Sequence, residues 1–137
     1  MSHIDPEREA FEAFKALPRD VPVNMLNLIK LKDVATYSDG STCSGSEAYA
    51  AYGRDSGPIF QRVGGTIIWR GEPKVMLIGP GSEDWDIAFV ARYPTAGAFL
   101  EMVTDPDYRI AVKHRQAAVA DSRLLRTHEM AGDDVFG

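Results

Sequence analysis

The sequence has few of the residues that bind metals or form disulfides. Cys43 is the one cysteine among 137 residues, which excludes an internal disulfide and a cysteine-rich zinc site. The three histidines, His3, His114 and His128, lie far apart, and none stands in a His-x-x-x-His or Cys-x-x-Cys arrangement. We therefore predict that the chain has no metal site.

The sequence also lacks an excess of basic charge and any long apolar run. Acidic residues outnumber basic ones by 20 to 15, and the net charge of −5 argues against a nucleic-acid binder, which needs a basic face. No apolar run approaches the roughly 20 residues that cross a bilayer, and the first residues lack the basic and apolar regions of a secretory signal. We expect a cytoplasmic protein that binds neither nucleic acid nor membrane.

The glycines form none of the motifs that bind nucleotides. Gly64-Gly65 and Gly79-Pro80-Gly81 match neither the dinucleotide-binding fingerprint nor the P-loop, and no Gly-x-Ser-x-Gly hydrolase elbow occurs. These glycines are better explained as the end of a helix and the end of a hairpin. With 45% hydrophobic and 26% charged residues, the chain has the composition of one globular domain.

Apolar periodicity predicts helices that alternate with strands. Helices are expected over 5–17, 44–63, 95–103 and 105–119, where Asp5, Ser44, Thr95 and Asp105 are their N-caps and Gly57-Pro58 kinks or divides the second. Strands are expected over 22–31, 66–70, 74–78, 86–93 and 122–128, with 66–70 and 74–78 paired in a hairpin. Residues 33–45 have the composition of a loop.

With the first helix set aside, we interpret this order as β-α-β-β-α-β, the ferredoxin-like arrangement of the α+β class, with an antiparallel sheet and helices on one face. The domain spans 21–130, between an N-terminal helical extension at 1–20 and a tail at 131–137. Strands 22–31 and 86–93 carry apolar residues on both faces, unlike a half-exposed strand. A second copy packed sheet against sheet would cover the open face, so we predict a homodimer. The alternative is that the N-terminal helix covers it.

Several segments resemble one known family. They are NMLNLIKLK at 24–32, SGSEAYAAY at 44–52, Gly64-Gly65, DPDY at 105–108, HRQAA at 114–118 and DSRL at 121–124. From about residue 22 to 128 they resemble, in this order, the uncharacterised family called domain of unknown function 1330 (DUF1330). That family is similar in fold to the dimeric α/β barrels, a superfamily of small monooxygenases, isomerases and haem-degrading proteins. The resemblance implies the fold and the homodimer, and it implies no particular reaction.

One cluster of charged and aromatic residues suggests chemistry. Glu83, Trp85 and Asp86 precede a strand, while His114 and Arg115 lie in the last helix, and we expect them to meet near one end of the sheet. There His114 is the candidate catalytic acid or base, because its pKa is ordinarily near neutral. Arg115 is the candidate catalytic group that stabilises an anion. The alternative is a structural ion pair that fixes the helix to the loop.

Aromatic and polar residues within the strands suggest a ligand pocket. The predicted ligand contacts are Asn27, Trp69, Arg70, Trp85 and Tyr108. Asn27 is informative because a polar residue in an apolar strand must find a partner or face a cavity. In the cofactor-free oxygenases of the superfamily, an Asn is combined with a Trp and a His, so that resemblance suggests Asn27, Trp69 and His114 as such a set.

Together these patterns predict a homodimer that binds a small, anionic and partly apolar molecule between sheet and helices, with no tightly held cofactor. Whether it is an enzyme stays open. If it is one, we expect proton-transfer or oxygenation chemistry. The first alternative is a non-catalytic ligand-binding or regulatory module that uses the same cleft. The second is a haem-handling protein, which needs an axial histidine that opens onto a large apolar cavity.

Overall fold

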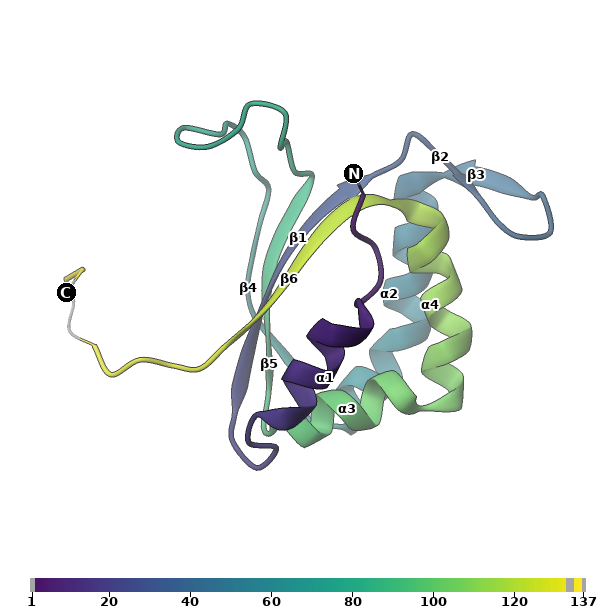
Figure 1. Ribbon diagram of the computed structural model, residues 1–137. Coiled ribbons are helices and arrows are strands. Elements are labelled where there is room, and N and C mark those ends of the chain that lie inside the picture. The colour runs from purple at the N-terminus through teal and green to yellow at the C-terminus, as the bar shows by residue number, and fades with distance from the viewer. Residues whose placement is uncertain (1, 133–134, 137) are drawn as a thin grey trace.

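The computed structural model describes residues 2–132, 135 and 136. Its helices and strands are α1 (Arg8–Ala16), β1 (Val23–Leu31), β2 (Val34–Thr36), β3 (Thr42–Ser44), α2 (Gly45–Arg62), β4 (Thr66–Gly71), β5 (Ile87–Tyr93), α3 (Ala96–Thr104), α4 (Pro106–Ala118) and β6 (Val119–Thr127). The main sheet is antiparallel, with the strand order β4-β5-β1-β6, and the helices lie on one of its faces (Figure 1). This is the ferredoxin-like α+β fold that the element order predicts.

Three of the predicted helix starts are confirmed. Ser44, Thr95 and Asp105 each accept a hydrogen bond from a backbone N–H two or three residues further on, at 2.7–3.0 Å. Each side chain thereby satisfies one of the backbone donors that a helix leaves free at its first turn.

The predicted start of the first helix is wrong. The helix begins at Arg8, after Glu7. The Glu7 side chain makes no capping hydrogen bond with any described residue. Both carboxylate oxygens of Asp5 lie 3.3 Å from the side-chain nitrogen of Gln116 on α4. Asp5 therefore fastens the segment before α1 to another helix instead of capping its own.

The second predicted helix is a single element. It runs without division from Gly45 to Arg62, although Pro58 lies inside it and lacks the N–H that a helix interior uses. Of the two predicted alternatives, a kink or a division at Gly57-Pro58, the division into two short helices is therefore wrong. The segment 33–45, expected to be a loop, contains the small β2–β3 hairpin, which is separate from the main sheet.

The predicted hairpin of 66–70 with 74–78 is also wrong. β4 pairs with β5, and the connection between them, residues 72–86, is described in full and contains no strand. Figure 1 shows this connection projecting beyond the end of the sheet, on the side away from the helices. An apolar, β-prone pattern requires a neighbouring strand, and the described chain provides none for 74–78.

The two faces of the sheet differ in their surroundings. On β1 the residues Val23, Met25, Asn27 and Ile29 are buried and face the helices. The alternate residues face the open side. There Trp69, Val90, Leu26 and Leu125 stand opposite one another in a row across all four strands.

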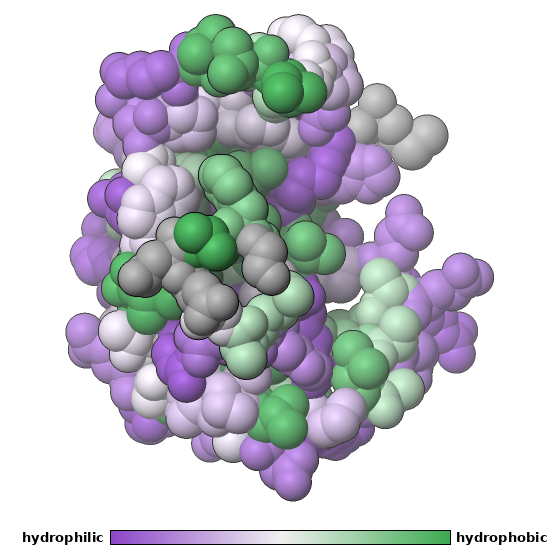
Figure 2. Space-filling model, turned by 90° about the vertical axis from the view of Figure 1, so that its left-hand side faces the viewer, coloured by the Kyte–Doolittle hydropathy of each residue, from purple (hydrophilic) through white to green (hydrophobic). Residues whose placement is uncertain are grey.

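No described helix covers this open face. Helix α1 lies on the other side of the sheet, with α2, α3 and α4, so the alternative that the N-terminal helix covers the open face is wrong (Figure 1). Figure 2 views the molecule from the open side of the sheet and shows separate groups of hydrophobic surface among hydrophilic surface. Within the described part of the chain, no helix has the length and apolar character to cross a membrane.

Candidate functional site

A cavity of about 1610 Å³ lies between the inner face of the sheet and the helices. Its floor is made by inward-facing residues of the strands, and α1 forms an outer wall. Helix α1, all of which is described, has no buried residue, so it rests loosely over the cavity rather than filling it. The cavity is much larger than the ~300 Å³ that a small ligand needs.

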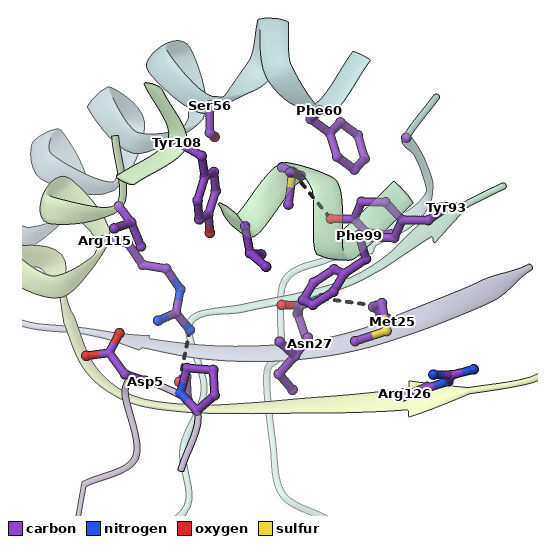
Figure 3. Close-up of a pocket in the computed structure, with 18 of the residues that line it drawn as sticks. Asp5, Met25, Asn27, Ser56, Phe60, Tyr93, Phe99, Tyr108, Arg115 and Arg126 are labelled. Carbon is purple, nitrogen blue, oxygen red and sulfur yellow. Dashed lines mark hydrogen bonds between the residues drawn. The ribbon is translucent and has the colours of Figure 1, made fainter. Parts of the chain in front are cut away.

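One end of the cavity is aromatic (Figure 3). The rings of Phe60 and Phe99 both meet Tyr93 edge to face, with centroids 5.4 and 5.3 Å apart. Phe14 of α1 adds a fourth ring, 5.0 Å from Phe99. The Tyr93 hydroxyl is turned to the sulfur of Met102, 3.8 Å away, so this end presents carbon and sulfur to a ligand.

The other end of the cavity carries the guanidinium of Arg115, which projects from α4 (Figure 3). It donates to the backbone carbonyl of Ile4 and, at 3.1 Å, to the Ser122 hydroxyl. Ser122 in turn donates to the carbonyl of His3 at 2.7 Å. The segment before α1 is thereby tied across this end by Arg115 and β6.

Two tyrosines line the cavity between these ends. The hydroxyls of Tyr52 and Tyr108 are 2.9 Å apart. Burial raises the pKa of Tyr108 far above its ordinary value, and the neighbouring Tyr52 raises it further. Burial raises the pKa of Tyr49 in the same way. The phenols of Tyr49 and Tyr108 therefore stay protonated at neutral pH. Either Tyr52 or Tyr108 donates the bond between them, so one hydroxyl of this pair still has its proton available for a ligand.

Asn27 supplies a polar group to the floor. Its side-chain nitrogen donates to the backbone carbonyl of Met25 at 3.0 Å, and the residue is only 9% exposed. No described residue donates to its amide oxygen. Since the residue lines the cavity, this oxygen is a candidate acceptor for a ligand.

Among the residues predicted from the sequence, Asn27, Arg70, Tyr108 and Arg115 line the cavity. Trp69 lies in the apolar row of the open face. Trp85 is buried at the end of the β4–β5 connection, where the guanidinium of Arg123 lies 5.1 Å from its ring. Neither tryptophan is among the described residues that line the cavity. The structure therefore brings together four of the predicted residues and separates the tryptophans from them.

His114 lies outside the cavity, although Arg115 lies inside it. The His114 Nδ1 is 2.6 Å from the Tyr37 hydroxyl, and its Nε2 is 3.1 Å from the Asp55 carboxylate. Adjacent residues of a helix point about 100° apart, which places these two side chains on different faces of α4.

The expected cluster of His114 and Arg115 with Glu83, Trp85 and Asp86 does not form among the described residues. Glu83 instead pairs with Arg123 at 3.4 Å, and Asp86 lies 3.7 Å from the Lys30 amine. The ion pair with the loop thus exists, but it is made by residues of β1 and β6 instead of α4.

Sequence reasoning missed several groups that line the cavity. They are Met25, Ser56, Phe60, Tyr93, Phe99, Ser122 and Arg126. The alternation of β1 provides a usable signal, because Met25 and Asn27 lie on the same face of one strand. Within the described residues, no group of three or more His, Cys, Asp or Glu side chains is placed to hold a metal ion.

Comparisons with known proteins give a family. Residues 41–127 match the family Domain of unknown function (DUF1330). A protein of unknown function from Rhodopseudomonas palustris, RPA0582, is 54% identical, with 96% of this chain and 100% of that chain covered and a TM-score of 0.91. Its methylated form is 55% identical, with 95% and 96% covered and a TM-score of 0.92. No curated protein matches.

More distant solved structures share the fold. A mutant of SnoaB, a cofactor-independent oxygenase from Streptomyces nogalater, is 12% identical, with 83% of this chain and 98% of that chain covered and a TM-score of 0.52. A dimeric protein of unknown function from Bacteroides fragilis is 15% identical, with 79% and 96% covered and a TM-score of 0.50. The fold, the matched segment and the identity to the Rhodopseudomonas protein agree, and the chain belongs to the DUF1330 family.

Proposed function

We propose that this protein is a homodimer that binds a small anionic, partly apolar molecule in the cavity between sheet and helices. One observation carries the proposal. Five arginines besides Arg123, which pairs with Glu83 and Asp121, line the cavity against two carboxylates, Asp5 and Glu7, in a chain whose net charge is −5. Positive charge is therefore concentrated at this site, which favours an anion.

The polar end is suited to hold the anionic group. A guanidinium has five N–H donors, and the bonds of Arg115 to Ile4 and Ser122 use only some of them. Tyr108 lines the same cavity with a protonated hydroxyl. Asp5, the carboxylate at this end, is held by Gln116. A ligand carboxylate thus has charged and neutral donors available together.

The aromatic end is suited to hold the apolar part. The rings of Phe60, Tyr93 and Phe99 already pack against one another, so a flat or aliphatic group can bury its surface against preformed walls. The separation of the two ends in Figure 3 favours an amphipathic ligand over a compact inorganic ion.

Binding without catalysis fits the geometry better than catalysis. In the catalytic alternative, His114 is the acid or base for proton transfer or oxygenation, with Arg115, Asn27 and Trp69 around the substrate. SnoaB, which shares the fold, is a cofactor-independent oxygenase. However, the His114 nitrogens are engaged by Tyr37 and Asp55 outside the cavity, and Trp69 faces the open side of the sheet.

The test uses two matched probes, 1-naphthoate and its neutral carboxamide, in titration calorimetry. We expect the acid to bind more tightly, and Arg115→Met to weaken the acid about 10- to 100-fold, the range of a charged hydrogen bond, while barely changing the amide. Arg54→Met, an exposed arginine outside the cavity, is the control. Equal affinity for acid and amide, with no effect of Arg115→Met, refutes the anion site.

His114→Ala tests whether His114 takes part in binding. A binding module predicts unchanged affinity for naphthoate in this variant, since His114 does not line the cavity. A drop in affinity as large as that of Arg115→Met contradicts the assignment.

The homodimer rests on the open face, where an apolar row crosses the sheet without a described helix above it. Light scattering should give twice the 15.1 kDa chain mass at high concentration. A chain mass that stays at one copy over all concentrations refutes the homodimer and leaves the ligand site untouched.

A further inference from the structure

The segment 73–79 of the β4–β5 connection, which we call the arm, exposes apolar side chains to an unusual degree. Val75, Leu77 and Ile78 are 80%, 87% and 90% exposed, and Met76 is 38% exposed. Four consecutive apolar residues on a projecting loop are costly in water, because each leaves its hydrophobic surface uncovered.

The arm has no partner for its backbone either. Residues 73–79 make no backbone hydrogen bond with any other described residue. The same residues have the β-prone, apolar pattern that predicts a strand from sequence. Such a segment matches a surface that meets another chain, where its side chains are buried.

The open face offers a matching surface beside the arm. Its central row contains Trp69 and Leu125, which are 53% and 57% exposed, together with Leu26 and Val90. The arm follows shortly after β4, and Figure 1 shows it on the side of the sheet away from the helices. The alternation along the strands places the row on that side as well. Arm and row are therefore two exposed apolar surfaces on the same side of the sheet.

The size of this surface fits a dimer. A buried aliphatic side chain covers ~60–120 Å² and a tryptophan ~150–250 Å², so the exposed parts of the arm and row offer roughly 500 Å². Because about 57% of an interface is apolar, this apolar surface corresponds to a whole interface of roughly 900 Å² per partner. A standard interface needs about 800 Å² from each partner. The row alone provides less than half of that.

The charges around the row also permit a second copy to approach. Lys30 pairs with Asp84 at 3.0 Å, and Arg123 pairs with Asp121 at 3.0 Å. Arg92 lies within 3.3 Å of the Asn24 side-chain oxygen. An apolar centre surrounded by polar groups that are satisfied within their own chain is typical of protein interfaces.

We propose that the arm of each copy packs on the open face of a second copy, so that the two arms clasp the dimer. This inference rests on the proposed homodimer and assigns the arm its role there. By two-fold symmetry, each copy gives one arm and receives one. The pattern that predicts a strand at 74–78 then reflects burial against the partner.

The first experiment measures the dimer dissociation constant by sedimentation equilibrium. We expect Val75→Asp combined with Leu77→Asp to raise it at least about a hundredfold, because two side chains lose their burial. The control is Ile110→Asp, an exposed apolar position on α4. A dimer that is unchanged by the arm substitutions overturns the clasp but not the homodimer. A parent chain that is monomeric throughout overturns both.

A second experiment does not depend on the charged variants. Leu77→Cys, in a Cys43→Ser background, is labelled with a thiol reagent above the dimer dissociation constant, and Ile110→Cys in the same background is the comparison. Both side chains are exposed in the single chain. We expect labelling at position 77 to be at least about tenfold slower in the dimer and equally fast after dissociation by dilution. Equal rates at both concentrations overturn the clasp.

Discussion

Replacing Phe14 by alanine should release α1 from the cavity without unfolding the domain. Helix α1 has no buried residue, and its contacts with the core are made by the partly buried rings of Phe11 and Phe14. The Phe14 ring lies 5.0 Å from that of Phe99, and the guanidinium of Arg126 lies 4.7 Å from it. Arg126 also donates to the carbonyl of Phe14 at 3.1 Å.

The magnitude follows from these contacts. A fully buried Phe→Ala change costs ~3–5 kcal/mol, and for the half-buried Phe14 we take about half, ~2 kcal/mol. Loss of the ring pair with Phe99 and of the Arg126 contact adds ~0.5–1 kcal/mol each. The total is ~3 kcal/mol, while a nine-residue helix has no stability of its own in water. The substitution thus removes a large part of the contact between α1 and the core, while Phe11 and the bond from Arg126 to the Phe14 carbonyl remain.

Hydrogen exchange is the appropriate assay, because it reports local opening separately from global unfolding. The amides of α1 should exchange about a hundredfold faster in Phe14→Ala, and those of β1 and β5 should barely change. Glu12→Ala, on the exposed side of the same helix, should change exchange by less than about threefold. If β1 and α1 lose protection equally, α1 is an integral part of the core and the reasoning is wrong.

Three further predictions concern stability. Ser44→Ala should lower the free energy of unfolding by ~1 kcal/mol through loss of the α2 cap, measured by urea denaturation. The hydrogen bond from the backbone N–H of Asp107 lowers the pKa of Asp105 in the folded protein. The stability that Asp105 contributes is therefore complete above its usual pKa of 3.8 and is lost as the pH falls through the lower folded value. Asp105→Asn should flatten the acid side of a profile of Tm against pH. Burial raises the pKa of Tyr93 and Tyr108, so their contribution to the free energy of unfolding is complete below pH 10.0 and is lost as the pH rises above it. The phenolate absorbance of these two residues should therefore rise together with unfolding. Ionisation of Tyr93 and Tyr108 while the protein is still folded would contradict this.

The helix starts show how far local sequence determines this fold. Ser44, Thr95 and Asp105 are predictable because donor and acceptor lie within one turn. Asp105 keeps its cap through one carboxylate oxygen, although the distant Arg62 binds the other. Asp5 carries the same signal and fails. Its carboxylate meets Gln116, which is 111 positions away in the sequence and contacts it only in the folded chain. Capping signals are therefore reliable where the tertiary structure leaves an oxygen of the side chain for the cap, as it does at Asp105 and does not at Asp5.

Part of the cavity lining was predictable from the local sequence of a strand. Asn27 stands out as a polar residue in an apolar strand, and its place in the floor agrees with that signal. The choice between His114 and Arg115 was not predictable, because the sequence does not say which face of α4 meets the sheet. The fold turns Arg115 inward to Ser122 and leaves His114 to Tyr37 of the β2–β3 hairpin, a segment expected to be a plain loop.

The error at 74–78 has a different origin from the error at Asp5. At Asp5 another residue of the same chain takes the side chain that the local pattern assigns to a cap. At 74–78 no described residue takes the place of the expected strand partner, and the apolar side chains stay in water. The sequence at 74–78 favours a strand, yet the single chain neither pairs this segment nor covers the apolar face of the sheet. Such a disagreement between local sequence and the single chain is expected where the segment contacts another chain. The clasp proposed above gives the row through Trp69 and the arm at 74–78 one common explanation.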